Sequence, residues 1–415
     1  MKTSRISGFY KLDVDERLEI LKDFSNLSDE EVELLKKSKI GLDVANAMIE
    51  NVIGTFELPI GIATNFLIDG KDYLIPMVIE EPSVVAAASN GARIARVKGG
   101  FQTHYTGSIM IGQIQIITEN PLSAKFEILR HKDEIIEFAN DMESSIIRMG
   151  GGCKDLIVRE LDGMVLVHLL IDVKDAMGAN FINTMCERTA PFLERITKGK
   201  ALLRILSNLC PQRLAIAKAV FDKNAIGGEE VVEGILKAYE LAKIDIYRCA
   251  THNKGIMNGV CAVLIATGND FRAVESACHA YSAMMGYKPL THYEVNEEGD
   301  LVGYIELPMS VGIVGGVKVN PLARICLKIL GVESAEELAR VIASVGLAQN
   351  FSALRALVSE GIQKGHMRLH AKSLAISAGA KGEEVDKVVE RMIEEGKISL
   401  SRAKEILEEI RKIST

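Results

Sequence analysis

The stretch from residue 104 to residue 208 constrains the fold most, because its apolar residues switch between strand and helix spacing in a definite order. Residues 108–118 alternate as a strand does, and residues 123–149 carry apolar side chains at helical spacing up to three glycines at 150–152. Further strands are predicted at 155–159, 164–173 and 201–206, and a second helix at 180–196. The resulting order, βαββαβ, is that of a ferredoxin-like unit, which we expect to be inserted into a larger domain.

The residues on either side of this unit predict a larger, mixed α/β domain. Two short helices, with a capping box at 28–31, are predicted within residues 14–50, and residues 56–77 predict strands joined by a hairpin at Asp69-Gly70. Beyond the inserted unit we predict helices at 229–242 and 272–285, a buried strand at 261–266, strand-like residues at 301–319 and two amphipathic helices after residue 371. The predicted class is therefore α+β, with a discontinuous large domain (1–103 and 209–370), an inserted domain (104–208) and a helical C-terminal flap (371–415).

Composition excludes several classes of protein. With 48% hydrophobic and 25% charged residues, the 415-residue chain is neither disordered nor fibrous, and its net charge of −7 disfavours nucleic acid as a partner. We find no apolar run near the roughly 18 to 20 residues of a membrane span, and no secretory signal, so we expect a soluble, cytoplasmic protein with no membrane partner. The seven cysteines are scattered singly, so we expect buried thiols and no disulfide framework.

One segment has the position of a phosphate-binding loop. Neither a Gly-x-Gly-x-x-Gly loop nor a Walker motif is present, so a standard dinucleotide fold is unsupported. Residues 175–180 (DAMGAN), however, lie between a predicted strand and a predicted helix, where free N–H groups and the helix dipole favour a phosphate. On the residues alone, an ordinary helix start is the favoured interpretation.

Three charged residues are candidates for acid–base chemistry. Lys254 is predicted in a polar loop at 251–255 before the apolar strand, and Asp270 at the other end of that strand. A lysine held charged by an aspartate can stabilise an oxyanion, but a structural salt bridge and a helix N-cap explain the two residues as well. Glu81 is either a surface glutamate in the first turn of a helix or, if buried, a proton donor.

Two histidines raise the question of a metal. His366 and His370 have the i, i+4 spacing of helical metal ligands, but the glutamate of a His-Glu-x-x-His motif is missing and no third ligand is indicated. We therefore expect no metal. His366, predicted in a mobile loop between Gly365 and Met367, is either an acid or a surface residue.

Taken together, these segments resemble one enzyme family. The matching segments are 50–54 (ENVIG), 58–61 (LPIG), 76–83 (PMVIEEPS), 175–180 (DAMGAN), 248–258 (RCATHNKGIMN), 267–272 (TGNDFR), 311–317 (VGIVGGV) and 365–367 (GHM). They occur in family order over nearly the whole chain. The sequence is therefore similar to 3-hydroxy-3-methylglutaryl-CoA (HMG-CoA) reductases of the class II form, which lack membrane spans.

The resemblance implies a set of site residues. It implies four catalytic residues, Glu81, Lys254, Asp270 and His366. It implies contacts to the hydroxymethylglutaryl group from Ser83, Arg248 and Asn258, with Asn208 and Gln349 lining the site. The inserted unit then corresponds to the NAD(P)-binding domain, with Asp175, Met177, Gly178 and Asn180 in its dinucleotide segment.

The implied reaction is the reduction of HMG-CoA to mevalonate and CoA by two successive hydride transfers from NAD(P)H, or its reverse. Lys254 is expected to stabilise the oxyanion of each transfer, and Glu81 to protonate it. Asp270, between the two, is expected to keep the lysine charged. His366 would protonate the departing CoA thiolate, and Arg248 would bind the free carboxylate of the substrate. The forward direction belongs to the mevalonate pathway of isoprenoid biosynthesis.

The resemblance also bears on the cofactor and on assembly. In NAD-using relatives an aspartate lies two helical turns before the Gly-Gly-Gly-Cys segment, and that register gives Glu143 here, with Asp141 nearby. An acidic side chain there repels a 2′-phosphate, so we expect NADH to be preferred over NADPH. Family members place the site at a dimer interface, which implies a homodimer or an assembly of dimers.

Two other classes of function remain open from the residues. A non-redox CoA-thioester acyl transferase or synthase needs a nucleophile, and Cys249, beside Arg248, is the only cysteine near the expected site. A ligand-binding protein that has lost catalysis is disfavoured because all four catalytic residue types are present.

Overall fold

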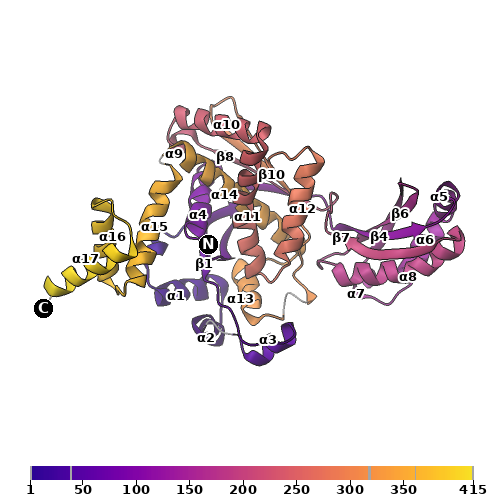
Figure 1. The fold of residues 1–415 in the computed structure, drawn as a ribbon, viewed down its shortest axis with the longest axis horizontal. Helices are drawn as coiled ribbons and strands as arrows, with labels where there is room; N and C mark the ends of the chain where they lie inside the picture. Colours follow the sequence, from indigo (N-terminus) through magenta and orange to yellow (C-terminus); the bar gives the residue numbers. More distant parts are fainter. Residues whose placement is uncertain (1, 38–39, 316–318, 360, 414–415) are drawn as a thin grey trace.

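The computed structural model describes residues 2–37, 40–315, 319–359 and 361–413, and within 362–369 and at 413 it describes the backbone alone. It contains a six-stranded sheet of order β2-β1-β3-β8-β10-β9 and a four-stranded sheet of order β5-β6-β4-β7. The six-stranded sheet and its helices form a large unit in the middle, the four-stranded sheet forms a small unit at one end, and three C-terminal helices lie at the other end (Figure 1). The predicted α+β class is confirmed.

The strands of the large unit are antiparallel except where β1 meets β3. They are β1 (Ile60–Ile68), β2 (Lys71–Val78), β3 (Phe101–Tyr105), β8 (Leu214–Phe221), β9 (Thr291–Val295) and β10 (Leu301–Pro308). The hairpin predicted at Asp69-Gly70 is confirmed, with both residues at positive φ, 48° and 80°, as a two-residue hairpin turn requires.

The helices of the large unit pack around one central helix. They are α4 (Val84–Ala95), α9 (Lys223–Ile226), α10 (Glu229–Ile244), α11 (Ile246–Ala266), α12 (Phe271–Met284), α13 (Pro321–Leu330) and α14 (Ala335–Val358). Helix α14 lies between α4 and α11 and against β8, and is buried along most of its length. The close approach of α4 to α14 depends on small residues. A Cβ added at Gly91 of α4 would lie 2.5 Å from the Ala348 carbonyl oxygen of α14.

Helix α14 is also apolar and long enough to cross a bilayer by length and composition, and within the described residues it alone passes that test. Of its apolar window, 72% is buried inside the protein, as in the core helix of a globular domain. The sequence prediction missed this segment because polar residues, among them Gln349 and Asn350, interrupt its apolar run.

Helix α11 overturns two sequence predictions. The strand predicted at 261–266 and the polar loop predicted at 251–255 both lie inside this one helix. A short apolar run gives the same pattern in a buried strand and in a buried helix, and here the second half of the helix is buried on nearly every side. Lys254 therefore lies in mid-helix.

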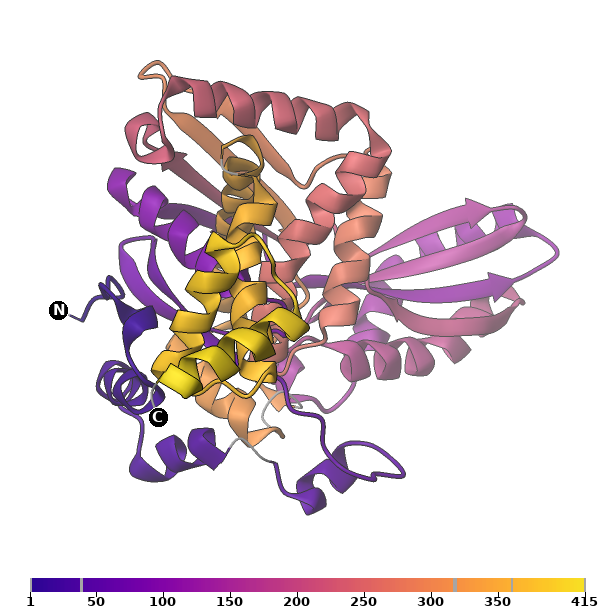
Figure 2. The ribbon, with the colours of Figure 1, turned by 60° about the vertical axis from the view of Figure 1, so that its left-hand side comes forward.

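The N-terminal region contains three helices where two were predicted: α1 (Val14–Ser25), α2 (Asp29–Lys37) and α3 (Leu42–Met48). A short 3₁₀ turn, η1 (Phe9–Lys11), precedes α1, and a second, η2 (Arg96–Lys98), follows α4. The capping box at 28–31 is confirmed, because Ser28 and Glu31 exchange side-chain to backbone hydrogen bonds. In Figures 1 and 2, α1 to α3 lie along one edge of the large unit.

The small unit has the βαββαβ order predicted for it, in an antiparallel sheet. Its elements are β4 (Ile109–Ile117), α5 (Pro121–Arg130), α6 (Lys132–Asn140), α7 (Ser145–Arg148), β5 (Gly152–Leu161), β6 (Met164–Asp172), α8 (Ala179–Thr197) and β7 (Lys200–Ser207). The chain leaves the large sheet after Tyr105 and returns to it at Leu214. The small unit has its own hydrophobic core beneath one face of the sheet.

The single helix predicted over 123–149 is instead three helices. Helix α6 ends at Asn140 because that side chain pairs with the backbone of Cys153, at 2.8 Å to both its N–H and its carbonyl oxygen. The Asn140 side chain therefore hydrogen-bonds to the backbone of β5, and the chain does not continue as a helix beyond Asn140. Residues 141–144 are not helical, so the helical register that selected Glu143 does not hold.

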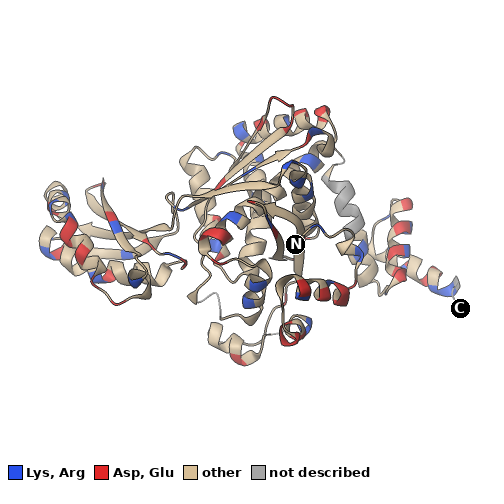
Figure 3. Cartoon of the chain, turned by 180° about the vertical axis from the view of Figure 1, so that it is seen from behind, with Lys and Arg blue, Asp and Glu red and all other residues tan. Residues whose placement is uncertain are grey.

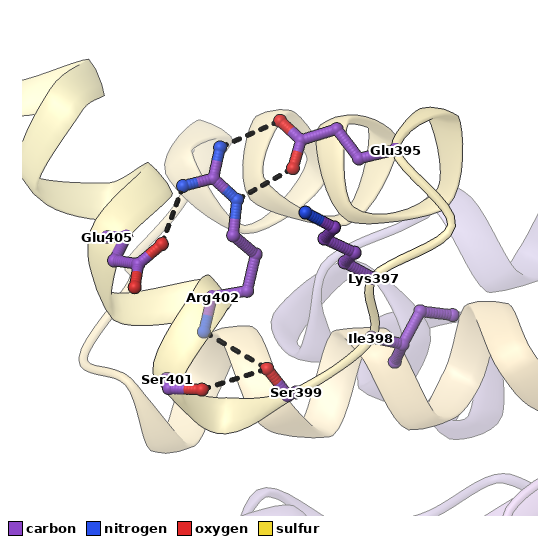
Figure 4. Close-up of a pocket in the computed structure, with 7 residues that line it drawn as sticks. All are labelled: Glu395, Lys397, Ile398, Ser399, Ser401, Arg402 and Glu405. Atoms are coloured by element: carbon purple, nitrogen blue, oxygen red, sulfur yellow. Dashed lines mark hydrogen bonds and ion pairs between the residues drawn. The ribbon is translucent and has the colours of Figure 1, made fainter.

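The C-terminal region forms three helices, α15 (Ile362–Ser377), α16 (Glu383–Glu394) and α17 (Leu400–Ile413), with a hydrophobic core of their own. Figure 3 shows acidic residues on α16 and basic residues near the end of α17. A surface hollow between α16 and α17 is bridged by Arg402, whose guanidinium pairs with Glu395 at 2.6 and 2.8 Å and with Glu405 at 2.7 Å (Figure 4). The cation is therefore already neutralised by protein carboxylates.

Candidate active site

Glu81 and Lys254 form an ion pair at the centre of the candidate site. Glu81 lies in the turn between β2 and α4, and Lys254 in the middle of α11. The lysine Nζ lies 3.1 Å from the glutamate Oε2, with the two side chains 58% and 37% exposed. Helix α11 packs on both β2 and α4, which brings together residues 173 positions apart in sequence.

Asn258 joins the pair from the next turn of α11. Its Nδ2 donates to the same Glu81 Oε2 at 3.4 Å, so one carboxylate oxygen accepts from a cation and from an amide. Lys254 and Asn258 are four residues apart and therefore lie on one face of the helix. The structure thus brings together three of the predicted site residues.

Asp270 does not join this group, contrary to the prediction that it lies between Lys254 and Glu81. Its Oδ1 caps α12, accepting from the N–H groups of Arg272 and Ala273, both at 3.1 Å, and pairs with the Arg272 side chain. Burial raises the pKa of Asp270, but these hydrogen bonds outweigh it and lower the pKa. The structural interpretation, a helix N-cap, is confirmed.

The separation follows from the helical geometry of α11. From Lys254 to the end of the helix at Ala266 the backbone rises about 18 Å, at about 1.5 Å per residue, and Asp270 follows that end. No ion pair within the described part of the chain joins Lys254 to Asp270. Within one chain, therefore, α11 holds Asp270 apart from Lys254.

Arg248 is a half-buried cation in the first turns of α11. Burial lowers the pKa of its guanidinium, although a guanidinium remains charged at neutral pH. Among the ion pairs of the described residues, none includes Arg248, and its backbone N–H is the group that bonds to Asp245. A half-buried guanidinium with no protein carboxylate has the chemistry to bind a carboxylate ligand.

Gln349 contributes an unsatisfied polar atom. It lies on α14 with 5% of its surface exposed, and its Oε1 has no hydrogen-bond partner among the described residues. The side chain packs against Gly259, which follows Asn258 on α11, since a Cβ added there would lie 3.1 Å from the Gln349 Cβ. A buried acceptor without a partner beside the site can accept from a ligand hydroxyl.

A groove of about 970 Å³ opens at Glu81 and Ser83. Ser83 adopts the left-handed conformation, φ 76°, at the start of α4, and its side chain makes no capping hydrogen bond. Arginines 5, 17 and 93 line the groove further along. The groove therefore contains Glu81 of the acid–base pair and these three arginines, which we call its basic wall, among mainly apolar residues. Asn208, predicted to line the site, is exposed just after β7.

The predicted cofactor segment lies between β6 and α8, as its sequence position indicated. Gly178 is the N-cap of α8 at φ 102° and has no side-chain cap, so the helix presents its first N–H groups uncapped. A Cβ at Gly178 would lie 2.5 Å from Val173, so no larger residue fits this turn. Asn180 is exposed in the first helical turn, whereas Asp175 is already engaged, its Oδ1 accepting from Ala335 N at 2.8 Å.

Three further predictions concern His366, Glu143 and metals. The His366 side chain lies outside the described residues, but its backbone is part of α15, so the predicted loop is wrong. Glu143 is almost fully exposed, 3.5 Å from Arg148. Among the described residues no group of three or more His, Cys, Asp or Glu side chains is placed to hold a metal ion.

Comparison with known proteins decides the family. The model of the family described as hydroxymethylglutaryl-coenzyme A reductase matches residues 13–371. The chain belongs to this family. It is 66% identical to the HMG-CoA reductase of Archaeoglobus fulgidus over 99% of this chain and 95% of that protein. It is 39% identical to a probable HMG-CoA reductase of Borreliella burgdorferi over 79% of this chain and 77% of that protein.

Solved structures of HMG-CoA reductases share the fold. An HMG-CoA reductase of Streptococcus pneumoniae superposes with a TM-score of 0.83 at 43% identity, over 97% of this chain and 99% of that one. A class II HMG-CoA reductase of the same organism, bound to NADPH in open conformations, superposes with a TM-score of 0.81 at 43% identity, over 96% of this chain and all of that one. The predicted enzyme class, an NAD(P)H-dependent HMG-CoA reductase of class II, is confirmed.

The geometry also bears on the rival thioester chemistry. Cys249 is fully buried, and burial raises the pKa of its thiol. A buried thiol with a raised pKa is a poor nucleophile, so the acyl-transferase hypothesis loses the residue on which it depended.

Sequence reasoning overlooked one residue at the junction of the two units of this reductase. Arg213, between β7 and β8, is fully buried and donates to backbone carbonyls of the predicted cofactor segment. No motif signalled it, because its partners are main-chain oxygens that any sequence supplies.

Proposed function

We propose that this reductase acts on HMG-CoA at the site formed by Glu81, Lys254 and Asn258. The observation that carries the proposal is the 3.1 Å pair of Glu81 and Lys254 at the end of a groove lined by arginines. When bound, the reduced nicotinamide supplies the hydride, twice for each mevalonate formed. In the assay, pure protein with HMG-CoA and NADH or NADPH is expected to oxidise two cofactors per mevalonate; no oxidation with either cofactor would refute the activity.

The residue roles follow from the charge that develops on the substrate. Hydride addition to the thioester carbonyl, and later to the aldehyde, leaves negative charge on oxygen. Lys254 is a fixed cation that stabilises this oxyanion, and Glu81, in its protonated form, is the acid that protonates it and is left as the carboxylate. Asn258 holds the Glu81 carboxyl toward the lysine, since it donates to the same oxygen.

The substrate's polar groups have matching partners around this pair. The free carboxylate of the hydroxymethylglutaryl group fits the unpaired Arg248, and a substrate hydroxyl fits the unsatisfied Oε1 of Gln349. Ser83 and Asn208 are proposed as further contacts. The phosphates of the CoA part suit the basic wall of the groove, where Arg5, Arg17 and Arg93 lie.

For His366 we propose protonation of the CoA thiolate, which leaves when the hemithioacetal formed by the first hydride collapses to mevaldehyde. Replacing His366 with alanine is therefore expected to lower kcat for HMG-CoA by roughly 10²–10⁴-fold. Reduction of added mevaldehyde, which contains no thiol to expel, should remain within a few fold of wild type. Equal losses on both substrates would contradict the assignment.

For the cofactor we propose that residues 175–180 hold its phosphates at the start of α8, where Gly178 leaves room for a close approach. NADH is proposed as the preferred cofactor, with NADPH as the alternative, because an acid, Glu143, precedes the Gly-Gly-Gly-Cys segment as in NAD-using relatives and its side chain is exposed, although it does not lie on a helix. The ratio of kcat/KM for NADH to that for NADPH tests the preference.

We also propose the division of the chain into a catalytic domain (1–103 and 209–370), a cofactor domain (104–208) and a C-terminal flap (371–415).

We further propose a homodimer, or an assembly of dimers, working in the cytoplasm. Residues 49–59 form neither helix nor strand, and Ile49, Ile53 and Phe56 on this segment are largely or fully exposed. Apolar side chains exposed in this way mark a contact surface. A second copy would also bring an Asp270 to Lys254, since the Asp270 of the same chain lies beyond the end of α11, at the start of α12.

This arrangement predicts complementation between two inactive variants. If Asp270 of one chain acts on Lys254 of another, subunit exchange between Lys254→Ala and Asp270→Ala should restore about a quarter of wild-type activity, since half of the dimers contain one intact site. The control mixes Lys254→Ala with Glu81→Gln. It should stay inactive because that pair forms within one chain. No recovery in the first mixture would show that Asp270 does not act across the interface.

A further inference from the structure

Arg213 is a buried cation without an acidic partner. It is fully buried between β7 and β8, at the junction of the small and large units (Figure 1), and among the ion pairs of the described residues none includes it. Its guanidinium nevertheless finds acceptors in several directions. Nε donates to the Tyr105 hydroxyl at 2.9 Å, and the terminal nitrogens donate to the carbonyls of Met177 (3.2 Å), Ala176 (3.2 Å) and Val311 (2.5 Å).

A guanidinium suits this position because its donors point in fixed, divergent directions. Burial of an unpaired charge is unfavourable unless hydrogen bonds compensate for the lost water. Here three main-chain oxygens and one hydroxyl supply that compensation. The same bonds tie Arg213 to three segments that are distant in sequence, at Tyr105, Ala176-Met177 and Val311.

The acceptors belong to elements on both sides of the junction. Ala176 and Met177 lie in the segment that leads into α8, whereas Val311 lies in the loop after β10. The two loops touch closely, since a Cβ added at Gly312 would lie 2.5 Å from Met177 N, and Ile313 N donates to the Asp175 carbonyl at 3.0 Å. Arg213 lies in the protein interior and donates hydrogen bonds to both loops.

The loop after β10 is in turn bonded to the end of α11. Gly312 N donates to the Oδ1 of Asn269 at 2.8 Å, and Asn269 is buried immediately before Asp270. A continuous path therefore runs from the start of α8, through Arg213 and residues 311–312, to the turn that carries Asp270.

We propose that Arg213 is a positioning residue that holds the start of α8 against the loop after β10 and so sets the affinity for the nicotinamide cofactor. It touches neither the substrate groove nor the Glu81–Lys254 pair. The proposal rests on the proposed function in one respect, that residues 175–180 bind the cofactor.

The test is Arg213→Lys, which keeps the charge but replaces a planar fork by a single ammonium that cannot reach all four acceptors. The KM for NADH and NADPH should rise about tenfold or more, because a small shift of a positioning loop is costly. The KM for HMG-CoA should stay within about twofold. Direct titration of NADH fluorescence should show the same weakening.

Two further variants distinguish the proposed positioning role from a general loss of structure. Arg355→Lys changes a matched arginine, whose Nε donates to the Ile226 carbonyl at 2.6 Å, and should leave the cofactor KM unchanged. Gly312→Ala pushes the same two loops apart without touching Arg213 and should weaken NADH binding as well. If Arg213→Lys does not fold, Gly312→Ala decides.

An unchanged cofactor KM in Arg213→Lys, or equal rises in both KM values, would overturn the proposal. An unchanged NADH affinity in Gly312→Ala would also overturn it. If instead the wild type binds NADH but never oxidises it with HMG-CoA, while Arg213→Lys binds NADH more weakly, the positioning role stands and the proposed reaction fails.

Discussion

Replacing Lys254 with alanine is expected to lower kcat for HMG-CoA reduction by roughly 10²–10³-fold or more, the range seen when one oxyanion-stabilising donor is removed. The lysine Nζ lies 3.1 Å from the Glu81 Oε2, so the variant loses the group proposed to meet the developing alkoxide. The KM for HMG-CoA should change much less, because the interaction is strongest in the transition state. Steady-state oxidation of NADH measures both constants.

The matched control is Lys237→Ala. Lys237 is also a helical lysine paired with a glutamate, Glu233 at 2.6 Å, but it lies exposed on α10. Its turnover should equal that of the wild type. A Lys254→Ala enzyme that kept kcat within about threefold of wild type would rule out the lysine as the main oxyanion stabiliser, whatever the outcome for Glu81.

The second large effect is expected on stability. Phe351 on α14 is fully buried and stacks on Phe221 of β8, with ring centroids 3.8 Å apart. Phe351→Ala leaves a cavity where the central helix meets the sheet and is expected to lower the free energy of unfolding by about 3–5 kcal/mol. Urea denaturation should show this as a lower midpoint with an unchanged slope.

A control on the same helix separates cavity formation from any general effect of an alanine substitution in α14. Leu357 is partly exposed near the end of α14, and Leu357→Ala should shift the urea midpoint far less. Equal shifts in the two variants would mean that the core contact of Phe351 contributes little. Because α14 packs between α4 and α11, the Phe351 variant should also lose activity as it unfolds.

Sequence reasoning succeeded where the signal is local. The hairpin at Asp69-Gly70, the capping box at 28–31 and the βαββαβ order of the small unit each depend on residues that are neighbours in the chain. Spacing and turn chemistry suffice for these features, because the backbone conformation there is decided within a few residues.

It failed where packing overrides local pattern. The apolar run at 261–266 is buried inside α11, and nothing in a run that short distinguishes a strand from a buried helix. The place of Asp270 beside Lys254 was implied by the family resemblance alone. Within one chain α11 rises about 18 Å from Lys254 to its end at Ala266, before the turn that carries Asp270. The break of the predicted helix at Asn140 has a similar origin, since its cause is a bond to the backbone of Cys153.

The sequence by itself determined the family, the order of the elements in the small unit and the residue types able to reduce a thioester, because these depend on side-chain chemistry and on short-range backbone periodicity. Only the tertiary structure decided which groups meet. It paired Lys254 with Glu81, 173 positions away, turned Asp270 onto its own helix and buried Arg213 among carbonyl oxygens. These contacts depend on how α11 packs across β2 and α4 and on how the two sheets are joined. Such long-range packing cannot be predicted from the periodicity of the sequence.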